Sequence, residues 1–406
     1  MTDHEPRRLT DGRANDQLLY FTSPSLTADD RTLVFISDRD SPVPKDRDPR
    51  AAVNLYALDR DTGQVRRLTD NDEGYLRSYV YFEGLHERGL GLASPCLHAA
   101  SGDVYYIQGR ELRCVNVRGG APRTLAELPA GQVTGFTHVS DDNTRICVPT
   151  IDAAAFADVK AIDATVQRLG LAGHLRVFDT ATGAELYDIP VERGWVTHVQ
   201  FQPGSSERIL YNHEWPSDCG VRRVWLWDGE RHLRLRDEGG GGAHPRRRED
   251  WVCHEVWTRD GAWVVYHGTY GGHTGGPSFV GRVRPDGSGR AEVSFDPRYR
   301  RYGHFTLGAG HDLLVSDGYY EPDGDAGAGG DPSLGGAGGG AWISLARVDW
   351  ERGAVHWRPL CRHGSSWSSQ DAHPHPVFSH AGDEVLFTSD AEGKRAVYAV
   401  PAHATS

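Results

Sequence analysis

Short apolar runs alternate with turns along the whole chain. One unit shows the pattern most clearly: residues 25–38 hold an Asp-Asp turn followed by an apolar run, and residues 54–70 hold a second hairpin. Asp61, Thr62 and Gly63 in that hairpin have the residue types of a tight turn, because Asp accepts hydrogen bonds from the following backbone and Gly adopts a positive φ at low cost. Runs of this kind, separated by Gly-rich turns, predict many short strands rather than long helices.

This unit recurs along the sequence. Its copies begin near Ser25, Ser94, Gly135, Val196, Val252, Tyr302 and Ala372. Repeats spaced as these starting residues are, each with four short strands, are typical of the blades of a β-propeller. The sequence therefore predicts an all-β fold, a seven-bladed β-propeller that takes up residues 1–406 as a single domain.

The two ends of the chain are expected to meet and close the ring of blades. The last unit ends after three strands, near Pro401, and lacks a fourth. The sequence RRLTD at residues 7–11 is identical to RRLTD at residues 66–70, which ends the first unit. We therefore expect the N-terminal strand to complete the last blade, which would leave no open sheet edge.

Insertions between strands are where function is expected, because loops on a rigid scaffold carry binding and catalytic residues. Residues 71–90 and 151–172 are long inter-strand segments, and residues 321–341 form a Gly-rich loop. The second segment has apolar residues at helical spacing, which predicts a helix there. These residues are Phe156, Val159, Val166 and Leu169.

Composition and charge narrow the class of protein. Of the 406 residues 38% are hydrophobic, and 44 Lys and Arg against 56 Asp and Glu give a net charge of −12. We expect neither nucleic-acid nor membrane binding, because both need a basic face and no apolar run is long enough to span a bilayer. The first residues lack the apolar stretch of a signal peptide, so we expect a cytoplasmic protein. Six cysteines at irregular spacing, without a CxxC, are expected to be reduced thiols.

The sharpest chemical signal is Gln370-x-x-His373-x-His375. In an extended strand, residues two apart point to the same side, so His373 and His375 would present two imidazoles together. Two imidazoles and an amide oxygen suit a divalent cation such as Mn²⁺, with water or substrate filling the open positions. The alternative is a pair of hydrogen-bonded histidines with no metal, and spacing alone leaves both open.

Three other units place a histidine at the equivalent strand start: His198, His254 and His304. The inner strands of a propeller begin around the central channel, so we expect these side chains to converge with the first pair. His98 and His138 occur in further units, and the alternative is that the repeats inherit a histidine for packing alone.

Residues 213–223 add a second group beside those strands. His213 is followed, nine residues later, by Arg222 and Arg223. An arginine beside a histidine cluster would bind a carboxylate through two parallel hydrogen bonds. For one of the adjacent pair an outward, solvated position is expected instead, because neighbours on a strand alternate faces.

Longer segments resemble one enzyme family. They are HEWPSD with RRVWLW, VCHEVWTRDGAWVVY, YGHF with VSDGYYEP, and SSWSSQDAHPHPVFSHAGDEVLFTSDAEG. In these segments the chain resembles the oligogalacturonate lyases, pectin-degrading seven-bladed propeller enzymes. The Q-x-x-H-P-H motif is the most specific part, and the resemblance is strongest from about residue 195 to the end.

The resemblance implies roles for individual residues. The family binds Mn²⁺ through three histidines and a glutamine, which here match His304, Gln370, His373 and His375, although another divalent cation could serve. The family's candidate base, in a strand with H-E-x-W, matches His254, and its active-site arginine before x-W matches Arg223. His198 and His213 match family histidines near the substrate pocket.

The implied activity is metal-dependent β-elimination of short uronate oligosaccharides, oligogalacturonides above all, to 4,5-unsaturated products. Ser217 stands where the family often has a second histidine, and Asn15-Asp16-Gln17 replaces a C-H-R-N-type segment. One alternative is therefore a lyase of the same family with another uronate substrate. The other is a non-catalytic binding propeller resembling the TolB-type periplasmic scaffolds, which would need an export signal and no His/Gln cluster. The sequence does not give the oligomeric state.

Overall fold

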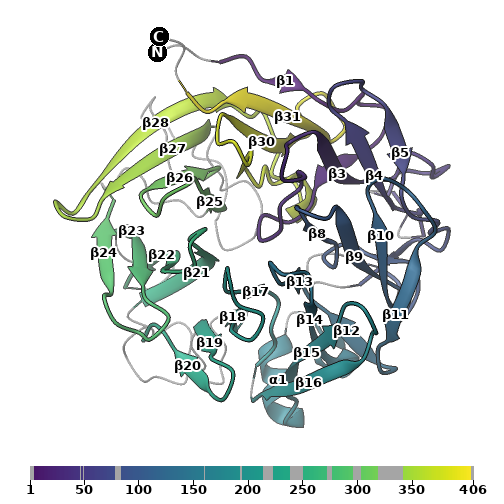
Figure 1. Cartoon of the computed structure of the whole chain (residues 1–406), viewed down its shortest axis with the longest axis horizontal. Coiled ribbons are helices and arrows are strands. Elements are labelled where there is room, and N and C mark those ends of the chain that lie inside the picture. Colours follow the sequence, from purple (N-terminus) through teal and green to yellow (C-terminus); the bar gives the residue numbers. More distant parts are fainter. Residues whose placement is uncertain are drawn as a thin grey trace.

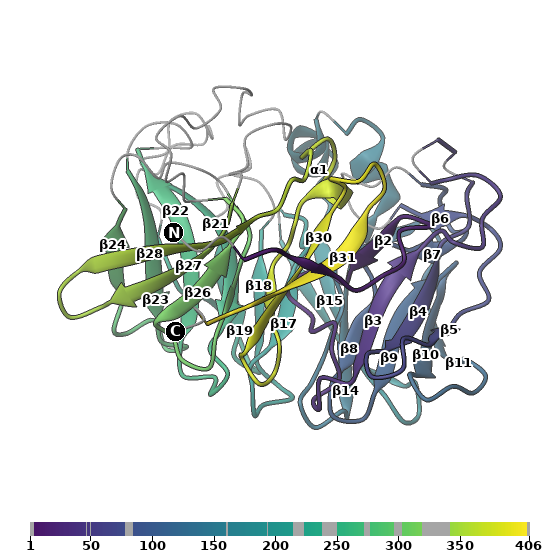
Figure 2. The same ribbon diagram turned by 90° about the horizontal axis from the view of Figure 1, so that it is seen from above.

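Seven mostly antiparallel sheets surround a common centre in the computed structural model of the chain (Figure 1). The structure describes residues 4–45, 47–48, 50–77, 84–159, 161–192, 194–213, 223–237, 250–271, 277–295, 303–318 and 342–403. Each sheet matches one of the seven repeats, and seen edge-on in Figure 2 most strands run across the thickness of a disc. The predicted seven-bladed β-propeller is therefore confirmed.

The strands follow one another outward from the centre in each blade. Blades 1 and 2 contain β2 (Asp16–Leu18), β3 (Thr32–Ser37), β4 (Asn54–Asp59) and β5 (Val65–Arg67), then β8 (Cys96–His98), β9 (Asp103–Gln108), β10 (Glu111–Asn116) and β11 (Arg123–Glu127). Blades 3 and 4 contain β12 (Gln132–Thr134), β13 (His138–Val139), β14 (Arg145–Asp152), β15 (Gly173–Asp179) and β16 (Glu185–Val191), then β17 (Val199–Phe201), β18 (Ile209–Asn212), β19 (Val224–Trp227) and β20 (His232–Arg234).

The remaining blades repeat the arrangement. Blades 5 and 6 contain β21 (Asp250–Trp257), β22 (Val264–Tyr270), β23 (Ser278–Val283) and β24 (Ala291–Ser294), then β25 (Phe305–Leu307), β26 (Leu313–Ser316), β27 (Trp342–Asp349) and β28 (Ala354–Arg362). Blade 7 contains β29 (Val377–Phe378), β30 (Glu384–Ser389), β31 (Ala396–Pro401) and β1 (Arg7–Arg8).

The middle strands are apolar on both faces because each blade packs between two neighbours. In β3, Val34 and Ile36 belong to a core cluster shared with Leu97 of blade 2, whereas Leu33 and Phe35 belong to a cluster shared with blade 7. Successive side chains on a strand point to opposite faces, so one short apolar run contributes to two interfaces. The cores between blades hold the inner strands, and the histidines on them, in place.

The tight turn predicted at Asp61, Thr62 and Gly63 forms. The Asp59 carboxylate accepts hydrogen bonds from the Asp61 and Thr62 backbone N–H groups, and Gly63 follows with a φ of 73°. Asp179 does the same for Ala181 and Thr182 before Gly183. A side chain with a Cβ would be strained at that φ, which explains the glycine.

The N-terminal strand closes the ring, as predicted. Strand β1 pairs antiparallel with β31, Arg7 opposite Ala399 and Arg8 opposite Tyr398. The Leu9 N–H extends the pairing with a 2.8 Å hydrogen bond to the Val397 carbonyl. Figure 1 shows the two strands side by side at the rim.

The insertions differ in part from the prediction. Residues 71–90 include β6 (Tyr75–Leu76) and the first residue of β7 (Leu90–Gly91), and both strands join the sheet of blade 2. Residues 151–172 form the 3₁₀ turn η1 (Ala153–Phe156) and the helix α1 (Ile162–Leu169), which lies on one face of the disc (Figure 2). The predicted helical face is wrong for Val159 and Leu169, both exposed, because η1 and α1 are separate elements with different phases. The Gly-rich residues 321–341 lie outside the described residues.

No helix in the described part of the chain is long and apolar enough to cross a membrane.

Candidate active site

Histidines from four blades meet in the centre of the propeller. His198 precedes β17, His254 lies within β21, His304 precedes β25, and His373 and His375 precede β29. Figure 1 shows β17, β21 and β25 among the innermost strands. The rings of His254 and His304 have centroids 4.5 Å apart, and those of His304 and His375 are 4.0 Å apart. The convergence expected from the repeats is therefore confirmed for these residues.

Two repeat histidines do not join the cluster. The His138 Nδ1 accepts a hydrogen bond from the Phe201 N–H, and so links blade 3 to blade 4. His98 contacts Ser101 through Nδ1 and the Asp141 carbonyl through Nε2, and so links blade 2 to blade 3. For these two the packing interpretation describes what the structure shows.

Three of the central histidines could hold a metal ion. One ligand atom from each of His304, His373 and His375 lies within 4.8 Å of the other two. The His375 Nε2 is buried and has no hydrogen-bond partner among the described residues, as expected of an atom placed for a ligand. Burial lowers the pKa of His375 well below the usual value, and the neighbouring His304 and His373 lower it further. The ring is therefore neutral at neutral pH, the form that binds metal, and the donor set fits a divalent cation.

The backbone brings His373 and His375 together in a different way from the one predicted. Gln370 to Ala372 form the 3₁₀ turn η4, and His375 has a φ of +47°, so the pair does not lie on an extended strand. The strand itself begins only at Val377. The two ring centroids are 5.8 Å apart, so the predicted proximity holds although its predicted cause is wrong.

Gln370 begins η4, and its backbone carbonyl accepts the His373 N–H at 3.2 Å. A buried ion pair between Lys45 and Asp371 fixes this turn to the segment that joins β3 and β4. These two residues are more than three hundred positions apart, and no sequence pattern links them. A metal-ligand role for Gln370 stays a prediction.

Asp317 supports two of the three histidines. It follows β26, is fully buried, and accepts the His304 backbone N–H at 2.6 Å through Oδ1. Its Oδ2 accepts the His304 Nδ1–H and the His375 backbone N–H, both at 3.1 Å. Burial by itself raises the pKa of Asp317, but its interactions with His304 outweigh burial and the pKa lies below the usual value. The Nδ1 contact leaves the Nε2 of His304 as the atom with a lone pair for a metal.

His254 sits in a β-bulge. The register of β21 against β22 shifts between Cys253 and Glu255, and His254 is the extra residue, with a φ of +43°. Its Nδ1 lies 2.9 Å from the Gly303 carbonyl and 3.0 Å from the His267 Nε2. Since a carbonyl only accepts hydrogen bonds, the neutral ring carries its proton on Nδ1 and its lone pair on Nε2. Burial, then the neighbouring His304 and His267, lowers the pKa of His254 well below the usual value.

A buried carboxylate joins the expected arginine to the cluster. Arg223 precedes β19 and is 6% exposed, and its Nε lies 3.6 Å from the Glu255 Oε2. The other oxygen of Glu255 lies 3.5 Å from the His198 Nδ1. Glu255 is fully buried, so the arginine charge is balanced inside the protein. Sequence reasoning missed Glu255, although a buried-strand glutamate next to a candidate histidine is a recognisable signal.

His213 lies at the end of β18. Its ring packs against Tyr211 and Trp225 of its own blade, with centroids 5.9 Å and 5.4 Å away. A Cβ at Gly194 would lie only 2.1 Å from its Nδ1, so the glycine makes room for the ring. Burial lowers the pKa of His213 to about 3. Its predicted contact with substrate stays a prediction, and Ser217 and Arg222 lie outside the described residues.

Two aromatic residues missed by the sequence analysis pack against the histidines. Tyr20 and Phe21 follow β2, and their rings lie 5.1 Å from His375 and 5.2 Å from His254. Tyr20 also stacks on Phe136 at 3.8 Å. These rings make the surroundings of the cluster apolar and restrict the histidine rotamers.

Comparisons with known proteins find sequence similarity to oligogalacturonate lyases. No protein-family model matches the chain. Over 236 residues it is 27% identical to an oligogalacturonide lyase of Pectobacterium atrosepticum, a match that covers 54% of this chain and about half, 53%, of that protein. Over 363 residues it is 26% identical to an oligogalacturonate lyase of Dickeya dadantii, covering 85% of this chain and 82% of that protein. The chain is therefore similar, at low identity, to the oligogalacturonate lyases.

A solved oligogalacturonate lyase in complex with manganese has the same fold. It superimposes with a TM-score of 0.72 at 22% sequence identity, over 97% of this chain and 92% of that one. At this identity the likeness shows the fold. The described residues of this chain form seven blades and include buried histidine clusters that could bind a metal.

Proposed function

We propose that this protein is a Mn²⁺-dependent lyase that cleaves short uronate oligosaccharides, oligogalacturonides above all, by β-elimination. The observation that carries the proposal is the meeting of His304, His373 and His375 beside His254, with a ring centroid distance of 4.5 Å between His254 and His304. The similarity to oligogalacturonate lyases supports the reaction class.

His304, His373 and His375 would hold the metal, together with Gln370. When bound, a divalent cation supplies positive charge that stabilises a substrate carboxylate as negative charge builds up on it. Asp317 keeps the Nε2 of His304 available for that cation by accepting the proton on Nδ1.

His254 is the proposed base. The proton at C5 of a uronate is weakly acidic, because the adjacent carboxylate can take up charge. The lone pair on His254 Nε2 accepts that proton, the C5–H electrons form the C4=C5 double bond, and the C4–O bond breaks with its electrons on the leaving oxygen. The hydrogen bond from Nδ1 to the Gly303 carbonyl, 2.9 Å long, fixes the ring for this role.

Arg223 is proposed to bind the substrate carboxylate and to stabilise the enolate-like charge. Glu255 holds its guanidinium through the 3.6 Å contact, and burial strengthens the attraction between Arg223 and a substrate carboxylate. His198 and His213 are proposed to contact the sugar. The leaving oxygen takes its proton from water or from His198.

The test begins with protein that has been stripped by a chelator. Mn²⁺ is added back, and the ultraviolet absorbance of the C4=C5 product is followed with digalacturonate and trigalacturonate. Product that depends on metal supports the site, the reaction and the substrate together.

Two other results would redirect the proposal. Stoichiometric metal binding without product would favour a lyase for another uronate, which a substrate panel would identify. Neither binding nor product would contradict the proposal and favour a non-catalytic propeller. The cytoplasmic location expected from the sequence stays a prediction.

A further inference from the structure

A second group of metal-binding side chains lies next to the proposed base. Cys253, His254 and His267 are all buried, and one ligand atom from each lies within 4.8 Å of the other two. This group shares no member with the cluster of His304, His373 and His375, and its thiol makes it chemically different.

The β-bulge creates the group. Cys253 is the cross-strand partner of His267, so these two side chains share a face of the sheet. In a regular strand the next residue, His254, would point to the opposite face. The bulge sets two residues of β21 against one of β22, which turns the His254 side chain toward the other two.

The distances and donor types favour a soft, tetrahedral cation. The His254 Nδ1 and the His267 Nε2 are 3.0 Å apart. Two nitrogens about 2.0–2.1 Å from one tetrahedral Zn²⁺ would be separated by about 3.3 Å. The thiolate distinguishes this group from the three histidines, because a soft sulfur ligand favours Zn²⁺ over a hard cation such as Mn²⁺.

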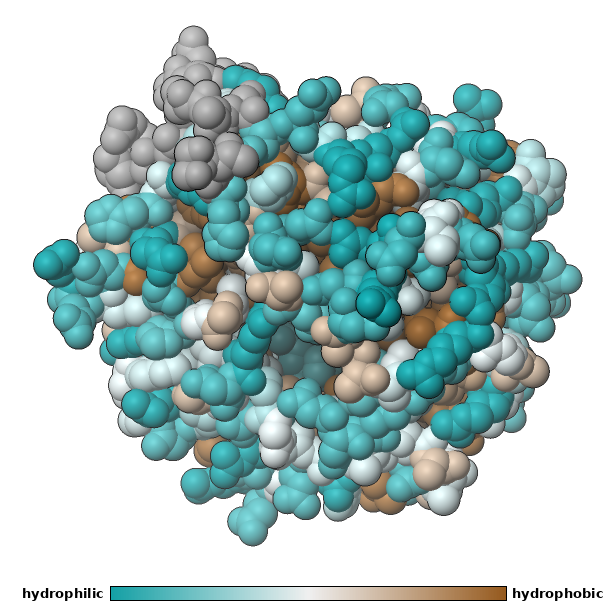
Figure 3. Space-filling model, turned by 45° about the horizontal axis from the view of Figure 1, so that its top comes forward, coloured by the Kyte–Doolittle hydropathy of each residue, from teal (hydrophilic) through white to brown (hydrophobic). Residues whose placement is uncertain are grey.

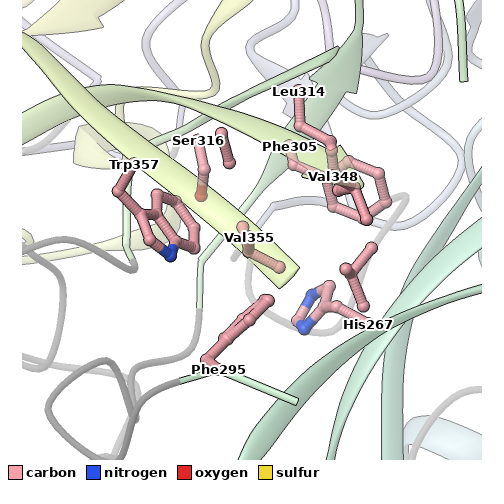
Figure 4. Close-up of a pocket in the computed structure, with 10 residues that line it drawn as sticks. His267, Phe295, Phe305, Leu314, Ser316, Val348, Val355 and Trp357 are labelled. Carbon is pink, nitrogen blue, oxygen red and sulfur yellow. The ribbon is translucent and has the colours of Figure 1, made fainter. Parts of the chain in front are cut away.

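The surroundings of His267 hold its ring in place and exclude water. Its ring packs edge-on against Phe305, with centroids 5.6 Å apart. Figure 4 shows His267 at the border of an apolar cavity between blades 5 and 6, with Phe295, Val355 and Trp357 in its lining. Burial lowers the pKa of His267 well below the usual value, so that its ring is neutral and able to bind metal.

We propose that Cys253, His254 and His267 form a site for Zn²⁺ or a similarly soft divalent cation, and that its occupancy switches the lyase off. Binding releases the thiol proton of Cys253 to solvent and moves the ring proton of His254 from Nδ1 to Nε2. A His254 ring that binds a cation through Nδ1 has no lone pair on Nε2 with which to take the C5 proton. The inhibitory part of this proposal rests on the proposed function, and the binding part does not.

Binding is tested with Co²⁺ as a spectroscopic probe of the full-length protein already loaded with Mn²⁺. A cobalt–thiolate bond gives a charge-transfer band in the near ultraviolet that nitrogen and oxygen ligands do not give. We expect the band in wild type, its loss on adding Zn²⁺, and its absence in Cys253→Ser. Cys96→Ser is the matched control and should keep the band, because Cys96 is equally buried but lies in blade 2 against Thr137.

Two results would refute the site: no band in wild type, or the same band in Cys253→Ser. His267→Gln is the second variant, in case Cys253→Ser fails to fold by circular dichroism. It too should lose the band.

Inhibition is tested in the lyase assay with saturating Mn²⁺ and increasing Zn²⁺. Cys253→Ser should need at least ~10-fold more Zn²⁺ for half-inhibition than wild type. Losing a direct metal ligand weakens metal binding at least as much as losing a residue that hydrogen-bonds to a ligand. Equal Zn²⁺ sensitivity of the two proteins would refute the switch. If no uronate is cleaved at all, the proposed function fails while the Co²⁺ band still tests the site.

Discussion

Replacing Asp317 by Asn should weaken Mn²⁺ binding without unfolding the propeller. The carboxylate accepts three hydrogen bonds, from the backbone and Nδ1 of His304 and from the backbone of His375. An amide has one accepting oxygen, and its NH₂ group would face a donor in either orientation. At least one buried N–H group would therefore lose its partner, and both histidines would be held less firmly.

The size of the effect follows because Asp317 accepts a hydrogen bond from a proposed metal ligand. Removing a residue that hydrogen-bonds to a metal ligand weakens metal binding about 10–100-fold, or about 1.4–2.8 kcal/mol. At a Mn²⁺ concentration 100 times the wild-type Kd, bound metal stabilises wild type by about 2.7 kcal/mol. The same concentration would stabilise the variant by only about 0.4–1.4 kcal/mol.

The assay is a Mn²⁺ titration by calorimetry, together with denaturant unfolding with and without Mn²⁺. Asp312→Asn is the control, because Asp312 lies on the same blade but pairs with Arg347 at the surface. It should bind Mn²⁺ as wild type does. A folded Asp317→Asn protein with wild-type affinity for Mn²⁺ would refute the reasoning.

Four other outcomes follow. His254→Ala and Arg223→Ala should each abolish turnover and leave Mn²⁺ stoichiometry unchanged, and wild-type rates in either would remove that assignment. His373→Ala should lose bound Mn²⁺ in a direct metal assay, and an unchanged stoichiometry would contradict its role as a ligand. Deleting residues 1–9 should lower the free energy of unfolding by on the order of 2–3 kcal/mol, at about 1 kcal/mol for each lost hydrogen bond with β31. Urea unfolding that matches wild type would show that β1 does not close the ring. Burial lowers the pKa of His213 to about 3, so between about pH 6.5 and pH 3 the unfolded chain binds a proton there that the folded chain does not, and stability is lost as pH falls through this range. The loss of unfolding free energy between pH 7 and pH 5 should therefore be about 2 kcal/mol smaller in His213→Gln than in wild type. Equal losses in the two proteins would contradict this.

The repeat architecture could be predicted because it depends on local chemistry. Strand length, the Asp and Gly of turns such as Asp59–Gly63, and the matching RRLTD segments are all visible within short stretches. Each blade buries its apolar run against its neighbours, so the number of repeats sets the number of blades. The closure of β1 on β31 follows from the missing strand alone.

The candidate site was predictable in its residue types and only partly in its geometry. His304, His373 and His375 meet as expected, but through a 3₁₀ turn and a positive φ at His375 rather than an extended strand. Periodicity rules assume regular backbone. They fail where contacts from a neighbouring blade hold the backbone in an irregular conformation. Asp317 does this by accepting a hydrogen bond from the His375 N–H.

The sequence alone determined the class of fold, the number of blades, the way the ring closes and the histidines worth examining, since each depends on patterns a few residues long. Only the tertiary structure decided which histidines meet, that Asp317 and Glu255 support them, and that a bulge turns His254 toward Cys253 and His267. The physical reason is that these contacts join different blades or break strand periodicity. Their positions depend on packing around the whole ring, which no local pattern records.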